Sequence, residues 1–351
     1  MRRCIALLLI LLITGSVQAE SDSISNPGLR VYVEETGGME MSGLLGGIAI
    51  DVGIGNLSNS TGDVPSSQWP AIAEVYTATW CGNCLDSEHA IKELTGERPI
   101  ETLHYHREYS EISDPFGTEV GDDRWIARYG VTNKVATDGL ERLPPSAVFN
   151  GEWLLSGSVP KVADSLSDDY AMSLDIGSSL PNEGLSASLS WTPDDVNSTN
   201  GTASWSMDRS ILNRTVEDIW LDDCMSPKRT SVTPVLFIVE NIARYEDGSN
   251  GLEYYPHVIR DIVRFENAVD ASSGSSTIQM PGVWDGEDLR LVLALEWSTI
   301  FEPLDEDCSS NLVESNDRSI PAIGALSSLA VIGVAALSPS CLLYTSPSPR
   351  D

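Results

Sequence analysis

A Cys-x-x-Cys motif lies where a strand-like segment gives way to a helix-like one. Residues 80–84 read Trp-Cys-Gly-Asn-Cys, after the apolar run 71–76 and before the helical pattern 85–94. This spacing lets the cysteines close a small disulfide ring or open to a dithiol. Cys81 would then lie at a helix N-terminus, where unpaired N–H groups and the helix dipole favour a thiolate. The motif predicts thiol–disulfide exchange, in which Cys81 attacks and Cys84 resolves the mixed disulfide.

Three other interpretations of the motif stay open. The small ring could be a purely structural disulfide. A zinc site would need a second ligand pair at matching spacing, and the chain has no second Cys-x-x-Cys. His89, on the predicted helix after Cys84, could complete a copper site. We favour the redox interpretation, with no metal and no cofactor.

The two ends of the chain predict export and a membrane anchor. Residues 1–19 combine an Arg-Arg start, an apolar stretch and a small-residue cleavage site, which is typical of a signal peptide. Residues 320–337 form an uncharged apolar run, slightly shorter than the ~20 residues that span a bilayer. We therefore expect an extracytoplasmic protein, anchored to the cell membrane by a C-terminal helix. Residues 341–351 read like one frame of a sequencing adapter and are excluded from the argument on fold.

The composition limits the partners of the chain. Asp and Glu number 52 against 21 Lys and Arg, and the net charge of −31 argues against nucleic acid as a partner. The hydrophobic content of 41% is sufficient for packed cores. The partners that we expect are exported proteins with thiols or disulfides, a redox recycling partner, and the membrane through the C-terminal helix.

A second disulfide is expected from cysteine counting. Cys4 leaves with the signal peptide, and Cys341 lies in the excluded tail. Cys224 and Cys308, both in acidic loops, remain. Outside the cytoplasm leftover cysteines usually pair, so we predict a structural Cys224–Cys308 disulfide, with two free thiols as the alternative.

The middle of the chain divides into three parts. Residues 20–68 are rich in glycine and serine, have strand-like pieces at 29–34 and 47–52, and are interpreted as an N-terminal extension and linker. Residues 69–172 alternate strands and helices, with an Asn-Gly hairpin turn at Asn150-Gly151, which indicates an α/β unit. Its further elements are expected at 101–106, 119–129, 143–155 and 160–172. Residues 173–316 are interpreted as all-β, with strands at 184–191, 202–207, 234–241, 257–265, 275–280 and 289–297.

The order of elements in 69–172, with its Trp-Cys-Gly-Asn-Cys motif and hairpin proline, resembles the thioredoxin superfamily. The resemblance implies a cis-proline beside the motif, for which Pro145 matches best and Pro144 is the fallback. Pro144 would be the residue whose backbone meets the bound substrate, and it has no N–H to donate. Trp80, Gly82 and Asn83 would flank the site and tune access to it.

Residues 173–316 resemble the second domain of secreted proteins that join a thioredoxin-like domain to an immunoglobulin-like β-sandwich. The expected fold class is therefore an α/β thioredoxin-like domain plus an all-β sandwich domain, with a signal peptide and a C-terminal transmembrane helix. The expected function is that of an extracytoplasmic thiol–disulfide oxidoreductase. The alternatives are a non-catalytic surface adaptor with a static disulfide and a copper-handling protein.

The sequence also suggests where three polar residues of the predicted strands lie. Glu74 neighbours the position where the resemblance places a buried acid. We expect it to be an edge or surface carboxylate, with a partly buried base as the alternative. His104 and His106 share one face of their strand by the period of two, and we expect both to pack beneath the first helix.

Overall fold

The computed structural model describes residues 26–35, 38–52, 57–108, 114–216, 225–286 and 288–304. The predicted signal peptide, the apolar run 320–337 and the tail 341–351 lie outside the described residues, as do Cys224 and Cys308. Within the described ranges, no helix has both the length and the apolar character needed to cross a membrane.

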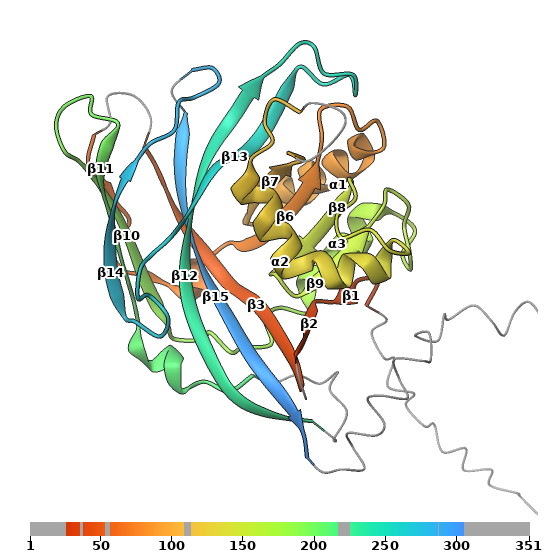
Figure 1. The fold of residues 1–351 in the computed structure, drawn as a ribbon, viewed down its shortest axis with the longest axis horizontal. Coiled ribbons are helices and arrows are strands. Elements are labelled where there is room, and N and C mark those ends of the chain that lie inside the picture. Colours follow the sequence, from red (N-terminus) through yellow and green to blue (C-terminus); the bar gives the residue numbers. More distant parts are fainter. Residues whose placement is uncertain are drawn as a thin grey trace, which may run out of the picture.

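One continuous mixed sheet of ten strands dominates the described part of the molecule (Figure 1). Its strand order is β1-β9-β8-β6-β7-β13-β12-β15-β3-β2. The strands are β1 (Leu29–Arg30), β2 (Tyr32–Glu35), β3 (Gly38–Asp51), β6 (Ala71–Thr77), β7 (Ile100–His106), β8 (Ser146–Phe149), β9 (Trp153–Ser156), β12 (Met225–Arg244), β13 (Tyr254–Arg264) and β15 (Leu289–Pro303). The two ends of this order, β1 and β2, are separated in the chain by Val31 alone, so the sheet curls until its edges nearly meet.

The centre of β12 shows why this sheet can be covered on both faces. Residues 235–239 read Val-Leu-Phe-Ile-Val and are all buried. Successive side chains of a strand point to opposite faces. Val235, Phe237 and Val239 accordingly join the core inside the curl, whereas Leu236 and Ile238 join the core on the outer face. A continuous apolar run is the sequence signature of a strand that is buried on both sides.

A second, smaller sheet covers the outer face of the long strands. It comprises β14 (Ser273–Gln279), β11 (Asn200–Met207), β10 (Ser186–Pro193) and β4 (Asn59–Ser60) in that order, with β5 (Val64–Pro65) also paired to β10. The tryptophans Trp191, Trp205 and Trp297 lie in the core between the two sheets. Two short 3₁₀ turns, Ser66–Gln68 and Arg209–Asn213, connect strands here.

Three α-helices complete the described fold. α1 (Cys84–Glu97) and α3 (Leu166–Asp175) share a core with the outward side chains Ala73 and Val75 of β6. α2 (Glu119–Ala136) begins at its N-cap Thr118 and contributes Trp125 and Tyr129 to the core inside the curl. Since polar residues of α2 such as Asp122 and Arg124 are buried as well, the helix is enclosed on several sides.

The predicted fold class is wrong, although the local elements are found close to where the sequence placed them. The chain does not form a thioredoxin-like α/β domain followed by an immunoglobulin-like sandwich, because the large sheet runs through the expected boundary. β7 pairs in parallel with β13, with Val258 opposite His104. The segment expected to be an extension supplies β3, which pairs with β15 across most of its length. The described structure is predominantly β, with a barrel-like mixed sheet.

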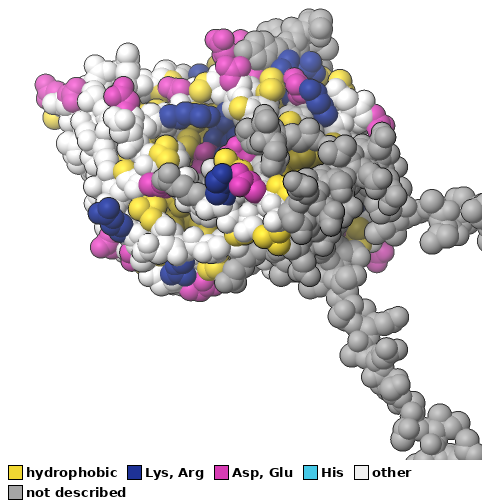
Figure 2. All heavy atoms as spheres, turned by 60° about the horizontal axis from the view of Figure 1, so that its bottom comes forward, with side chains coloured by type: hydrophobic (Ala, Val, Ile, Leu, Met, Phe, Trp, Pro, Cys, Tyr) yellow, Lys and Arg dark blue, Asp and Glu magenta, His cyan; other side chains and the backbone are white. Residues whose placement is uncertain are grey.

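The surface shown in Figure 2 carries charges of both signs. Acidic and basic side chains are scattered among polar and apolar groups on the coloured part of this face, without one dominant patch. Some acids are paired, as in the Lys134–Glu141 ion pair at 2.7 Å between two half-exposed side chains. Exposed pairs of this kind contribute little to stability.

Candidate functional site

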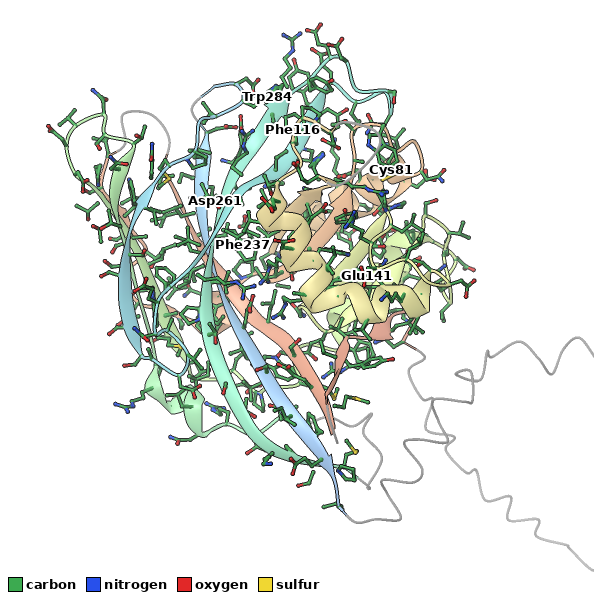
Figure 3. The ribbon with its side chains drawn as sticks, viewed as in Figure 1. Cys81, Phe116, Glu141, Phe237, Asp261 and Trp284 are labelled. Carbon is green, nitrogen blue, oxygen red and sulfur yellow. A yellow bond between two sulfur atoms is a disulfide. The ribbon has the colours of Figure 1, made fainter. Side chains whose placement is uncertain are left out.

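Cys81 and Cys84 are joined in a disulfide at the start of α1. Their Cα atoms are 5.4 Å apart, and the exposed fractions of the two residues are 6% and 1%. The loop from β6 is held by short-range bonds, since Cys81 N–H donates to Ala78 O at 3.1 Å and Cys84 N–H donates to Cys81 O at 3.2 Å. Figure 3 shows Cys81 beside α1, at the same end of the molecule as Phe116 and Trp284. The less buried cysteine is therefore the one that precedes the helix.

The residues that flank the disulfide differ in exposure. Gly82 and Asn83 are exposed, and Asn83 is the N-cap residue of α1. Trp80 is half-buried beside the two cysteines, and its ring lies 5.9 Å from the guanidinium carbon of Arg107. Trp80 therefore packs against the two cysteines, whereas the Gly-Asn dipeptide between them is exposed to solvent.

The peptide bond between Pro144 and Pro145 is cis, the geometry expected for Pro145. Both prolines are buried, and β8 begins at the next residue, Ser146. Ser146 pairs with Tyr76 near the end of β6, and continuing this antiparallel register places Pro145 opposite Thr77, just before the cysteine loop. The prolines therefore lie close to the motif in the sheet without forming part of the exposed surface.

The hairpin between β12 and β13 is fastened to the loop before Cys81. Asn250 N–H donates to Thr79 O at 3.1 Å, and the Asn250 side-chain amide donates to Ala78 O at 3.3 Å. Tyr255 holds this asparagine by donating its hydroxyl to Asn250 Oδ1 at 2.8 Å. We call these contacts the hairpin latch. The latch could not be predicted from the sequence, because it joins residues about 170 positions apart.

A buried carboxylate supports the same loop from behind. Asp114 Oδ2 accepts the Thr79 N–H at 2.7 Å and lies 3.2 Å from His106 Nδ1. Burial alone would raise the pKa of Asp114, but the hydrogen bond and charge of His106 hold it below its usual value. His106 also packs edge-on against Phe116 and Tyr255, so it connects the loop to the hairpin.

A cavity of about 400 Å³ opens between α1 and the β12–β13 hairpin. Its lining residues are Glu88, His89, Ile91, Lys92, Thr95, Thr102, His104, Ile242, Leu252, Tyr254, Pro256 and His257. Glu88 Oε2 lies 3.2 Å from His104 Nε2, and the ring centroids of His104 and His257 are 6.1 Å apart. His104 lies under α1 as the sequence predicted. The sequence suggested only that His257 shapes the β-sandwich, whereas this residue lines the cavity.

Glu74 is not the edge or surface carboxylate that the sequence favoured over a partly buried one. It is fully buried on the α2 side of β6 and accepts hydrogen bonds from the hydroxyl groups of Tyr105 and Tyr129. Arg124 of α2 donates to Glu74 at 3.2 Å and pairs with Glu296 of β15. The expectation failed because the sequence does not show that α2 enters the curl and brings an arginine to this carboxylate.

The described residues contain no group of three or more His, Cys, Asp or Glu side chains arranged to hold a metal ion. His89 is exposed on α1. The predicted Cys224–Cys308 disulfide falls outside the described ranges and stays a prediction.

Comparisons with known proteins add little to this geometry. No protein-family model matches the chain, and no similar curated protein was found. Among solved structures, the chain is similar to the crystal structure of protein AGR_C_4864 from Agrobacterium tumefaciens, with a TM-score of 0.36 and 13% sequence identity. The match covers 60% of this chain and 78% of that chain. A likeness at this level supports no conclusion about function.

Proposed function

We propose that this chain is a thiol–disulfide oxidoreductase that acts on exported proteins through the Cys81–Cys84 pair. The observation that carries the proposal is the disulfide itself, closed at the start of α1 with the less buried cysteine ahead of the helix. A thiolate released at Cys81 would face the N-terminal end of α1, where backbone N–H groups favour negative charge.

The proposed reaction proceeds in two exchange steps. A substrate thiolate attacks Cys81 Sγ, which breaks the Cys81–Cys84 bond, forms a mixed disulfide and releases the Cys84 thiolate. A second substrate thiolate then attacks the substrate sulfur and displaces Cys81, so the substrate is oxidised and the cysteine pair is reduced. The reverse sequence reduces a substrate disulfide, and relative reduction potentials together with the recycling partner set the direction.

The location of the reaction is part of the proposal. The predicted signal peptide at 1–19 and the apolar run 320–337 support a site outside the cytoplasm and an anchor in the cell membrane. An oxidising compartment also suits a chain whose resting pair is a disulfide. The expected partners are exported proteins with thiols or disulfides and a protein that recycles the cysteine pair.

A second candidate is an adaptor protein in which the Cys81–Cys84 bond is only structural. The observation that favours it is burial, since both cysteines are at least nine-tenths covered and the hairpin latch holds the preceding loop. A disulfide that never opens would need no access for a partner thiol.

Cysteine variants separate the two candidates. We expect Cys81→Ser to abolish oxidation of a fluorescent dithiol peptide. With the disulfide form of the same peptide, Cys84→Ser should accumulate a mixed disulfide, because the Cys81 thiolate attacks the peptide disulfide and releases one peptide thiolate while the resolving thiol is missing. Mass spectrometry identifies the trapped cysteine. An unchanged rate in Cys81→Ser, or no exchange by the parent protein, would remove the oxidoreductase and leave the adaptor.

A further inference from the structure

We infer that the cavity between α1 and the β12–β13 hairpin is a binding site for a small, uncharged aromatic molecule that carries a hydroxyl group. The inference goes beyond the proposed exchange reaction and does not depend on it, because the cavity is lined by neither cysteine. Its volume of about 400 Å³ lies within the range of small-molecule sites, ~300–1,000 Å³.

Most of the exposed cavity wall is apolar, although charged and hydroxyl-bearing residues of α1 and β7 also line it. Ile91 faces it from α1, and Leu252 and Pro256 face it from the hairpin. At its rim, Ile242 and Tyr254 are 51% and 55% exposed, which is unusual for large apolar side chains that gather at one place. Walls of this kind favour the flat apolar body of an aromatic ring system.

His104 and His257 form the floor of the cavity, and both hold buried ring nitrogens that have no hydrogen-bond partner among the described residues. His104 is 1% exposed, and its Nδ1 has no hydrogen-bond partner among the described residues, although its Nε2 lies beside Glu88. The Nδ1 of His257 is likewise buried and unpartnered there. Buried polar groups without partners are costly and rare. A ligand hydroxyl satisfies either imidazole tautomer, because it can both donate and accept.

The charges around the floor favour a neutral ligand. Burial, with the nearby charges of His104 and Arg290, lowers the pKa of His257 to about 4, so this ring is uncharged at neutral pH. Glu88 is already engaged by His104. At the buried floor a charged ligand would lose its hydration without an unmatched charge to receive it, because Lys92, the lysine among the lining residues, is exposed on α1.

The backbone conformation of His257 also supports a ligand-binding site. Its φ of 49° lies in the left-handed region, which is uncommon for residues other than glycine. Such conformations cluster at ligand-binding positions, where the surrounding structure holds them.

Imidazole NMR signals provide a direct test with 2-naphthol as the probe. The chain has four histidines, of which His104 and His257 form the floor and His106 lies outside the cavity lining. We expect 2-naphthol to shift the ring signals of His104 and His257 and to leave those of His106 in place. The anion 2-naphthoate, with the same rings, should bind at least tenfold more weakly. No shift at ~1 mM 2-naphthol, or equal binding of the anion, would overturn the inference.

Two variants locate the probe. Ile242→Glu places a charge at the rim and should weaken 2-naphthol binding at least fivefold, whereas Ile300→Glu, at another exposed isoleucine on β15, should not change it. His257→Asn should weaken binding about fivefold through loss of the imidazole, because asparagine tolerates the positive φ. Binding unchanged in both Ile242→Glu and His257→Asn would place the probe elsewhere and refute the site.

Discussion

At the scale of single residues, Glu74 shows how a charge can be accommodated in the core. Its carboxylate accepts from two tyrosine hydroxyls and from Arg124, and Arg124 is balanced in turn by Glu296. Burial, together with the nearby charge of Glu74, raises the pKa of Tyr129, so its hydroxyl stays protonated as a donor. The network joins β6, β7, α2 and β15, and it therefore ties the two parts of the large sheet together.

We expect Glu74→Gln to destabilise the protein by about 3 kcal/mol. The variant leaves Arg124 with one buried carboxylate and turns an amide donor toward hydroxyls that also donate. Urea unfolding measures the loss. The control is Glu93→Gln on the exposed face of α1, which should change stability by less than ~0.5 kcal/mol. Equal effects of the two substitutions would show that the network does not stabilise the fold.

Residues differ in how far the sequence reveals their role. Cys81 and Cys84 could be paired from the sequence because their spacing alone allows the bond. His257 and Glu74 could not be placed, because their surroundings come from strands and helices distant in the chain. The neighbours of a side chain, rather than its own type, decide whether it lines a cavity or supports the core.

At the scale of elements, the β12–β13 hairpin is fastened to the loop that precedes the disulfide. Its tip is bonded to Ala78 and Thr79, directly before the cysteine loop, while Leu252 of the same tip lines the cavity. The disulfide has little exposed surface, so a partner thiol needs local opening to reach Cys81.

We expect Asn250→Ala to speed reduction of the Cys81–Cys84 bond by dithiothreitol about five- to tenfold. Loss of the side-chain bonds to Ala78 and Tyr255 should weaken the latch by ~1–1.5 kcal/mol, and 1.4 kcal/mol corresponds to tenfold in the open population. Thiol trapping with mass spectrometry follows the rate.

The matched control for this variant is Asn200→Ala, an exposed asparagine at the start of β11. It should leave the rate of reduction unchanged. If Asn250→Ala also leaves the rate unchanged, the latch does not limit access to Cys81.

The periodicity of the sequence predicted where helices and strands lie better than it predicted how long they are. The strands expected at 71–76 and 101–106 and the helix at 119–129 are present as β6, β7 and α2. The strand expected at 234–241 is far longer, because β12 spans Met225–Arg244. Its first half is rich in polar residues and Pro, and it is held by pairing with β15 rather than by its own pattern.

At the scale of the whole molecule, the large sheet makes the described chain one structural unit. The pairing of β7 with β13 and the core inside the curl both cross the predicted boundary at 172/173. Strand pairing over such separations depends on tertiary contacts, which periodicity in the sequence does not reveal. This is why correct local elements were assembled into the wrong fold class.

We expect a fragment of residues 69–172 not to fold on its own. It would expose the edge of β7 and the face of α2 that packs against Phe237, where the Arg124 guanidinium lies 4.8 Å from the ring centroid. Near-UV circular dichroism and urea titration should show no cooperative transition, in contrast to the full chain. A cooperative transition in the fragment would show that this part is an independent domain.

The reduction potential of the Cys81–Cys84 pair tests the proposed function most directly. Equilibration of the folded chain in glutathione buffers, with thiol trapping and mass spectrometry of the peptide that holds both cysteines, gives the midpoint. We expect a reversible midpoint between about −120 and −270 mV, the range of exchange catalysts. A pair that stays oxidised below about −300 mV would be a structural bridge and would contradict the proposed function.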